Sequence, residues 1–221
     1  MKLSRLLFSF SILALLFAIQ CSVSPGRKIL VKGSVEPDIS IGMFLSGAPY
    51  AASPVVPNLD LGLRYGLTDR ITIGGSWSPI PIFTKEVIFV KNPFLAGQVL
   101  PPYKMLPSVN MYLAVPFFIP LRLGEFKAVP LVGVVIRKEW GQFGMYPIVE
   151  SAFDSDVFEN KINVHTNARL GIDWTTLNKT AFTLELGMDN IGYRNFLGNL
   201  TYGIPCIHIS ISHSFIKKQS D

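Results

Sequence analysis

The sequence predicts an all-β fold, an antiparallel up-and-down β-barrel of about 8–10 strands that crosses a membrane. Three observations predict it. Apolar and polar residues alternate with a period of two from residue 34 onward, and the intervening stretches are rich in Pro or polar residues. The polar side of the alternating stretches is rich in glycine. Small side chains mixed with a few charges suit the narrow interior of a barrel.

The N-terminus has the features of an export signal. Lys2 and Arg5 precede an apolar stretch at residues 6–19. That stretch is too short to span a bilayer as a helix, which takes about 20 residues, and a charged start before an apolar centre is typical of a signal peptide. The predicted segments are a signal peptide at 1–20, an N-terminal linker at 21–33, the barrel at 34–216 and a tail at 217–221.

Cys21 comes directly after the residues Phe-Ala-Ile-Gln, at the end of the apolar stretch. This region resembles a bacterial lipoprotein signal, in which the cysteine is lipidated and becomes the mature N-terminus. Ala18 and Ile19 fit that pattern, whereas Gln20 stands where a small residue is usual. The resemblance implies a lipid on Cys21. Cleavage nearby without a lipid, or an uncleaved segment, is the alternative.

The composition argues against a disulfide-stabilised fold and against a nucleic-acid partner. Cys21 and Cys206 are the two cysteines, too few for a disulfide framework. Loss of residues 1–20 removes two of the 20 basic residues and leaves 18 against 15 acidic ones. This small excess, without a Lys/Arg run, gives no indication of a nucleic-acid partner.

The alternation of apolar and polar residues gives the positions of the expected strands. We interpret the chain after the linker as one domain. The strongest candidates lie at 34–46, 59–67, 71–77, 109–119, 162–174, 182–188 and 206–215, and weaker ones lie at 85–91, 128–138 and 143–150. Connectors are expected at 47–57, 78–83, 100–107 and 151–161. Pro37 suits only a strand end or an edge, because proline has no N–H to donate.

The stretch LDLGLRYGLTDRITIGGSW, residues 59–77, is typical of a hairpin. If its apolar residues share a face, paired positions must sum to an even number, so the loop must be odd in length. A type I turn with a bulge around Thr68, Asp69 and Arg70 satisfies this condition. The pairs expected are Leu67 with Ile71, Tyr65 with Ile73 and Leu61 with Trp77, and in a later hairpin Ile172 with Leu184 and Trp174 with Phe182.

The polar face is the clue to the environment of these strands. The exposed face of a soluble sheet usually carries long Lys, Glu and Thr side chains, whereas this face is rich in glycine. A few charged side chains on it would have to pair inside a barrel. The lumen polar network is expected to contain Arg64, His165, Arg169, Asp173 and Glu185.

Aromatic residues stand near the ends of the apolar faces. Tyr65 and Trp77 lie toward opposite ends of one hairpin, and Trp174 and Phe182 flank the turn of another. Aromatic girdles occupy these positions in a transmembrane barrel. The alternative is that they close the ends of a soluble core.

The segment LGLRYGLTDRITIGGSW and the final strand, with alternating isoleucines before Phe215, resemble bacterial outer-membrane β-barrel proteins. The resemblance implies an outer-membrane location, membrane lipid as a partner, and recognition of the last strand by the barrel assembly machinery. Phe215 is followed by six more residues, IKKQSD, which departs from the terminal aromatic of that pattern. The implied role is structural, adhesive or that of a narrow, porin-like pore.

Two other functions stay open. A soluble lipocalin-like surface lipoprotein would bind an apolar ligand inside and turn Leu61, Ile73 and Leu184 inward. An outer-membrane hydrolase that modifies lipid A would use His208 and Ser210, which share a strand face, as base and nucleophile. Glu185 or Asp173 would orient the base. The sequence favours a non-enzymatic role, and it shows neither metal-ligand spacing nor a cofactor motif, so no cofactor is expected.

Overall fold

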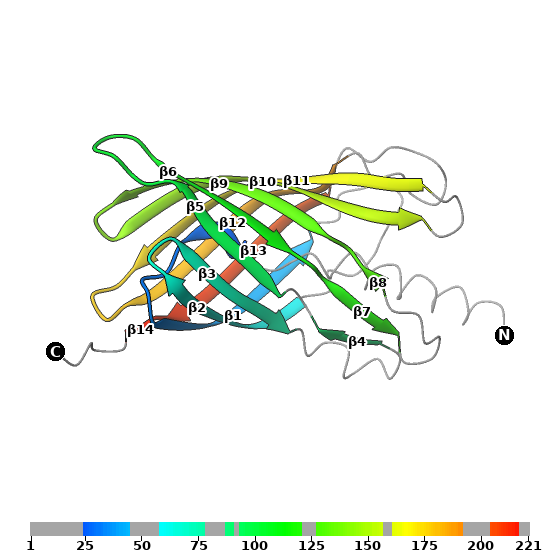
Figure 1. Ribbon diagram of the computed structural model, residues 1–221, viewed down its shortest axis with the longest axis horizontal. Helices are drawn as coiled ribbons and strands as arrows, with labels where there is room; N and C mark the ends of the chain where they lie inside the picture. The colour runs from blue at the N-terminus through cyan, green and yellow to red at the C-terminus, as the bar shows by residue number, and fades with distance from the viewer. Residues whose placement is uncertain are drawn as a thin grey trace.

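The chain folds into a closed antiparallel barrel of ten strands (Figure 1). The computed structural model describes residues 24–44, 58–77, 87–90, 93–120, 127–156, 161–191 and 204–216. The predicted signal peptide, Cys21 and the tail at 217–221 lie outside the described residues. The barrel confirms the predicted fold class.

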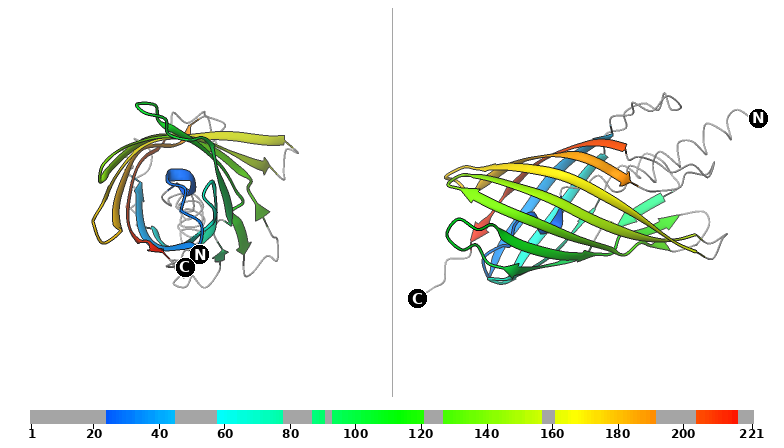
Figure 2. Two further views of the ribbon diagram at one scale, coloured as in Figure 1. Left: turned by 60° about the vertical axis from the view of Figure 1, so that its left-hand side comes forward. Right: turned by 90° about the horizontal axis from the view of Figure 1, so that it is seen from above.

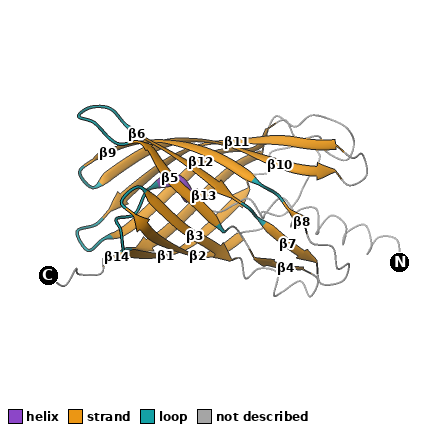
Figure 3. Ribbon diagram, viewed as in Figure 1, coloured by secondary structure: helices purple, strands orange, loops and turns teal. Residues whose placement is uncertain are grey.

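The wall contains β1 (Ser34–Phe44), β2 (Asn58–Thr68), β3 (Ile71–Trp77), β5 (Phe94–Leu100), β6 (Ser108–Ala114), β9 (Leu131–Trp140), β10 (Phe143–Asp156), β11 (Lys161–Thr175), β12 (Thr180–Ile191) and β13 (Ile204–His213). The short β14 (Phe215–Ile216) continues β13 past Ser214 along β1. A separate small sheet holds β4 (Val87–Val90), β7 (Phe117–Pro120) and β8 (Lys127–Ala128). The described part of the chain is otherwise strand and loop, apart from the single turn of η1 (Pro25–Arg27) (Figure 3).

Each wall strand pairs with its neighbours along the chain, and β13 pairs with β1 to close the ring (Figure 2). Ile41 lies opposite Ile209 in this closing pair. Closure satisfies the backbone N–H and C=O groups that an open edge would leave unpaired, at several kcal/mol each in hydrocarbon. The described part of the chain contains no helix long and apolar enough to cross a bilayer.

Three features of the strand arrangement differ from the predicted one. The strand β5 was not predicted, because Phe94 and Ala96 are buried inside while Leu95 is exposed outside, so apolar residues lie on both faces. The candidate at 109–119 divides into β6 and β7, with Pro116 between them. The connector expected at 151–161 is strand as far as Asp156, because pairing with β11 continues to the end of β10.

The register of the β2–β3 hairpin follows the predicted parity. Tyr65 lies opposite Ile73 and Leu61 lies opposite Trp77, as expected. Two predictions for this hairpin are wrong, the pairing of Leu67 with Ile71 and the odd loop length. Thr68 pairs with Ile71 across a two-residue turn of Asp69 and Arg70, and a bulge at Leu67 restores the parity instead. The β11–β12 hairpin has both predicted pairs, Ile172 with Leu184 and Trp174 with Phe182.

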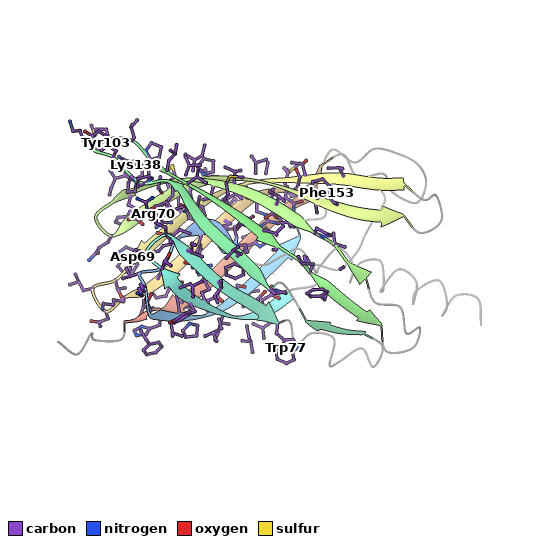
Figure 4. The ribbon with its side chains drawn as sticks, in the orientation of Figure 1. Asp69, Arg70, Trp77, Tyr103, Lys138 and Phe153 are labelled. Atoms are coloured by element: carbon purple, nitrogen blue, oxygen red, sulfur yellow. The ribbon has the colours of Figure 1, made fainter. Side chains whose placement is uncertain are left out.

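The apolar faces of the strands point outward. Leu63 is 55% exposed, whereas its neighbour Arg64 is 3% exposed. Leu61 and Ile73, which a lipocalin-like fold would turn inward, are 39% and 37% exposed. The outer surface is therefore the apolar one, and side chains radiate from it in Figure 4.

The outward apolar band has the height of a bilayer core. On β10 it runs from Phe143 to Phe153, and the outward residues between them are uncharged: Met145, Pro147, Val149 and Ser151. Ten residues at about 3.3 Å each, on a strand tilted by about 40°, give about 25 Å along the barrel axis. That matches the apolar band of transmembrane barrels.

Exposed aromatic residues lie at both ends of this band. At the end of the short turns, Trp174 stacks on Phe143 and Phe182, with ring centroids 6.5 and 5.8 Å apart. Trp77 and Phe153 lie toward the other end, away from the turn residue Asp69 (Figure 4). Aromatic side chains at two levels correspond to the two membrane interfaces.

Candidate functional site

The barrel lumen is the candidate site, because buried polar side chains collect there. The strands β1, β2 and β11 to β13 turn charged and hydroxyl groups inward. The strands β5, β6, β9 and β10 add an apolar cluster that includes Tyr112, Tyr146 and Val135. The lumen is therefore polar on one side and mixed on the other.

Lumen glycines make room for large inward side chains. Gly133 is the cross-strand partner of Tyr112, and Gly171 is the partner of Tyr146. A Cβ at either glycine would overlap the tyrosine ring. The glycine-rich polar face thus has a steric cause, since each glycine lets a ring lie flat against the wall.

Gly171→Ala should lower the free energy of unfolding by about 1–3 kcal/mol, because the new methyl group overpacks against Tyr146. Gly97→Ala is the matched control, since the nearest atom to a Cβ there, the carbonyl oxygen of Arg70, is 4.0 Å away. The urea midpoint of the gel-mobility shift between folded and unfolded barrel measures both. Equal effects at the two positions would contradict this packing.

The N-terminal residues 24–30, here called the plug segment, lie inside the barrel. Figure 2 shows this segment and its η1 turn within the ring of strands. Ser24, Arg27 and Leu30 are buried, and Ile29 packs against the apolar cluster. The sequence predicts this stretch to be part of a linker, whereas in the structure it lies inside the lumen.

Side chains of the wall bind the backbone of the plug segment at six groups. Because buried backbone groups need hydrogen-bond partners, these contacts fix the path of the segment. Asn110 Nδ2 donates to the Gly26 carbonyl at 3.0 Å, Arg137 Nη1 donates to the Arg27 carbonyl at 3.1 Å, and Arg64 Nη2 donates to the carbonyls of Pro25, at 3.3 Å, and Lys28. The Ser24 N–H donates to Glu185 at 3.1 Å, and the Leu30 N–H donates to Thr72 Oγ1 at 2.8 Å.

Arg27 binds two carboxylates of β1. Its guanidinium lies 3.4 Å from Glu36 Oε1 and 3.4 Å from Asp38 Oδ2. Glu36 also accepts a hydrogen bond from Arg64 at 2.9 Å. The charge of the plug segment is therefore matched by carboxylates of the wall.

Two further groups of ion pairs join side chains of the wall strands inside the lumen. Arg137 binds both carboxylate oxygens of Asp173, at 2.6 and 3.0 Å. Arg169 lies 2.7 Å from Glu150 and 3.7 Å from Glu185. Tyr112 donates to Glu150, and Tyr146 donates to Glu185 at 3.2 Å. Each buried charge named here has an opposite charge within reach, as burial requires.

The structure places four of the five expected network residues in the lumen. Arg64, Arg169, Asp173 and Glu185 are buried and ion-paired there, while the side chain of His165 lies outside the described residues. Sequence reasoning missed several members of the network: Arg27, Glu36, Asp38, Arg137 and Glu150. All but Arg27 have the inward parity of their strands, which was the available signal.

The residues of the hydrolase alternative also lie in the lumen. His208 and Ser210 are buried, and Glu185 lies opposite His208 in the register. Ser210 Oγ has no hydrogen-bond partner among the described residues, and a serine nucleophile needs an adjacent base. Asp173, the other orienting candidate, binds Arg137. Within the described ranges, no group of three or more His, Cys, Asp or Glu could hold a metal ion.

A closed barrel with an apolar outer band, aromatic ends and a polar, packed lumen defines a class of protein. It is a transmembrane β-barrel, with the architecture that bacterial outer-membrane barrels have. Single-chain barrels of this class have an even number of antiparallel strands, and the ten strands here fit that rule.

Solved structures similar to this chain come from that class. The chain is similar to the N-terminal β-barrel domain of OprF from Pseudomonas aeruginosa, with 10% identity, TM-score 0.30 and coverage of 84% of this chain and 100% of that one. It is also similar to Ail, the attachment invasion locus protein of Yersinia pestis, with 12% identity, TM-score 0.29, and 84% and 100% coverage. For the COG4313 outer membrane channel from Pseudomonas putida F1 the values are 14%, 0.39, and 88% and 100%. No protein-family model and no curated protein matches the chain.

Proposed function

We propose that this protein is an outer-membrane barrel that keeps its own lumen closed, with a structural role in the membrane. The observation that carries the proposal is the plug segment, whose backbone is hydrogen-bonded to the wall at six groups. With the plug segment docked, the inward side chains around it are buried. A ten-stranded barrel is narrow, so one peptide segment suffices to close it.

Planar bilayer recordings test this function directly. The full chain should insert as a folded barrel and give no steady conductance, because the plug segment fills the lumen. Folding is checked on the same sample by the change of gel mobility on boiling. A stable conductance from folded, wild-type protein would contradict the proposal.

We also propose that residues 1–20 direct export and that Cys21 carries a lipid. The support is the sequence pattern alone: a charged start, an apolar stretch and a cysteine directly after it. Radioactive palmitate should label the wild-type protein in cells and should not label Cys21→Ser. Equal labelling of both proteins would contradict lipidation at Cys21.

The last strand is the proposed signal for the barrel assembly machinery. Phe215 is the exposed first residue of β14, just past the end of β13, and its ring contacts that of His213 edge to face at 4.5 Å between centroids. Phe215→Ala should reduce the fraction of protein that becomes heat-modifiable in the outer membrane. Phe182→Ala, an exposed aromatic on the preceding strand β12, is the control and should assemble normally. An equal loss in both variants would argue for a general effect of the aromatic girdle instead.

A further inference from the structure

We propose that the plug segment can leave the lumen without unfolding the wall, that Arg27 holds it there, and that its release opens a narrow pore that prefers cations. This inference rests on the proposed function, in which the docked segment closes the barrel. It adds a conducting state to a protein whose resting state is closed.

The attachment of the plug segment to the barrel allows release. Each of the ten wall strands pairs with its two neighbours in the ring, and the plug segment belongs to none of these strands. It joins β1 through Gly33, which has a φ of +75°, a left-handed conformation that glycine adopts readily. The segment can therefore swing about this joint while the hydrogen bonds between strands stay intact.

The contacts of the plug segment are mostly exchangeable. Its six backbone hydrogen bonds go to wall side chains, and water that enters the lumen on release can take the place of each partner. Two apolar side chains, Ile29 and Leu30, add buried contact near the joint. No described strand pair depends on the segment, so these contacts decide between the closed and the open state.

Arg27 supplies the charge that holds the segment. It is the buried cation of the plug segment, and it lies against Glu36 and Asp38. A carboxylate in its place would face these two carboxylates at close range and be repelled. Charge reversal at this one position should therefore favour the released state.

The charged side chains that line the lumen determine which ions the open pore prefers. The described lumen residues of the strands include six carboxylates and three guanidinium groups: Glu36, Asp38, Asp60, Glu150, Asp173 and Glu185 against Arg64, Arg137 and Arg169. Release of the segment removes Arg27 from this set and leaves an excess of negative charge. Carboxylates that line a pore favour cations.

The space vacated is about as wide as one polypeptide chain. Neighbouring backbones in a sheet lie about 4.8 Å apart, which is the order of the width that a departing segment leaves. A monovalent cation that exchanges part of its hydration shell for lumen oxygens fits such a gap, whereas larger solutes do not. The conductance should therefore be small.

The test compares the full-length wild type with Arg27→Glu in planar bilayers, with Lys32→Glu as the matched control. Lys32 is exposed, so its reversal changes the net charge equally without entering the lumen. Arg27→Glu should conduct, with a reversal potential in a KCl gradient that indicates preference for K⁺, while the wild type and Lys32→Glu stay closed. A synthetic peptide of residues 24–33 should lower that conductance, and the same peptide with Arg27→Glu should not.

A second variant displaces the segment without touching a charge. A side chain at Gly26 would overlap the ring of Tyr112, so Gly26→Val should also conduct. The proposal is wrong if at least one variant folds and neither variant conducts. It is also wrong if the open state prefers anions. Loss of the folded barrel in both variants would also overturn it, because the segment would then be part of the wall's stability. Conductance of the wild type would instead count against the proposed function.

Discussion

Replacing Leu170 by arginine should lower the free energy of unfolding in a bilayer by about 2–4 kcal/mol, the cost of a cation at the bilayer midplane on a barrel surface. Leu170 is 49% exposed on the outer face of β11, four residues from Trp174 at one end and six from Val164 toward the other. No acidic side chain lies on the outer face of β11 between those two residues to pair with the new charge.

Leu177→Arg is the control for this substitution. Leu177 is 88% exposed in the turn between β11 and β12, beyond the apolar band, so the same substitution should cost about 0–1 kcal/mol. Urea titration of both variants in phospholipid vesicles measures the difference. Equal costs at the two positions would mean that the outer face of β11 is in contact with water.

Arg137→Met should destabilise the barrel by about 3–5 kcal/mol, because it leaves the buried carboxylate of Asp173 without its partner. Arg137 binds Asp173 through two hydrogen bonds and also donates to the carbonyl of Arg27. The loss therefore affects the wall and the plug segment together. Lys138→Met, at the next position on β9, should cost little, since its ammonium group donates to a surface carbonyl.

The double variant Arg137→Met/Asp173→Leu separates the two contributions. If most of the cost is the unpaired carboxylate, removal of Asp173 as well should recover much of the stability. The double-mutant cycle on urea midpoints measures this coupling. Additive losses would contradict the description of Arg137 and Asp173 as one buried unit.

Much of the wall could be predicted because a barrel in lipid inverts the usual burial pattern without changing its period. In β2, Leu61 and Leu63 point out while Asp60 and Arg64 point in, and the period of two alone places them on opposite faces. The glycines between them indicated which face is crowded. Parity then predicted the register of both hairpins, apart from the bulge at Leu67.

The two parts of the structure that were not predicted, β5 and the plug segment, show no periodic pattern in the sequence. On β5 apolar residues face both the lumen and the lipid, so its alternation is lost. The plug segment contains Pro25, Gly26 and two basic residues, which is typical of a loop, and nothing local indicates that it lies inside a barrel. Its position depends on wall side chains from Arg64 to Glu185, far along the chain, and that assembly is a property of the closed fold.

On β2 the apolar side faces lipid and the polar side faces the lumen. A photoactivated carbene probe dissolved in the lipid phase tests it on the wild-type barrel, with the labelled positions found by peptide fragmentation. Label is expected on Leu61 and Leu63 and is not expected on Asp60 or Arg64. Label on Arg64, or a β2 strand that the probe does not reach at all, would contradict it.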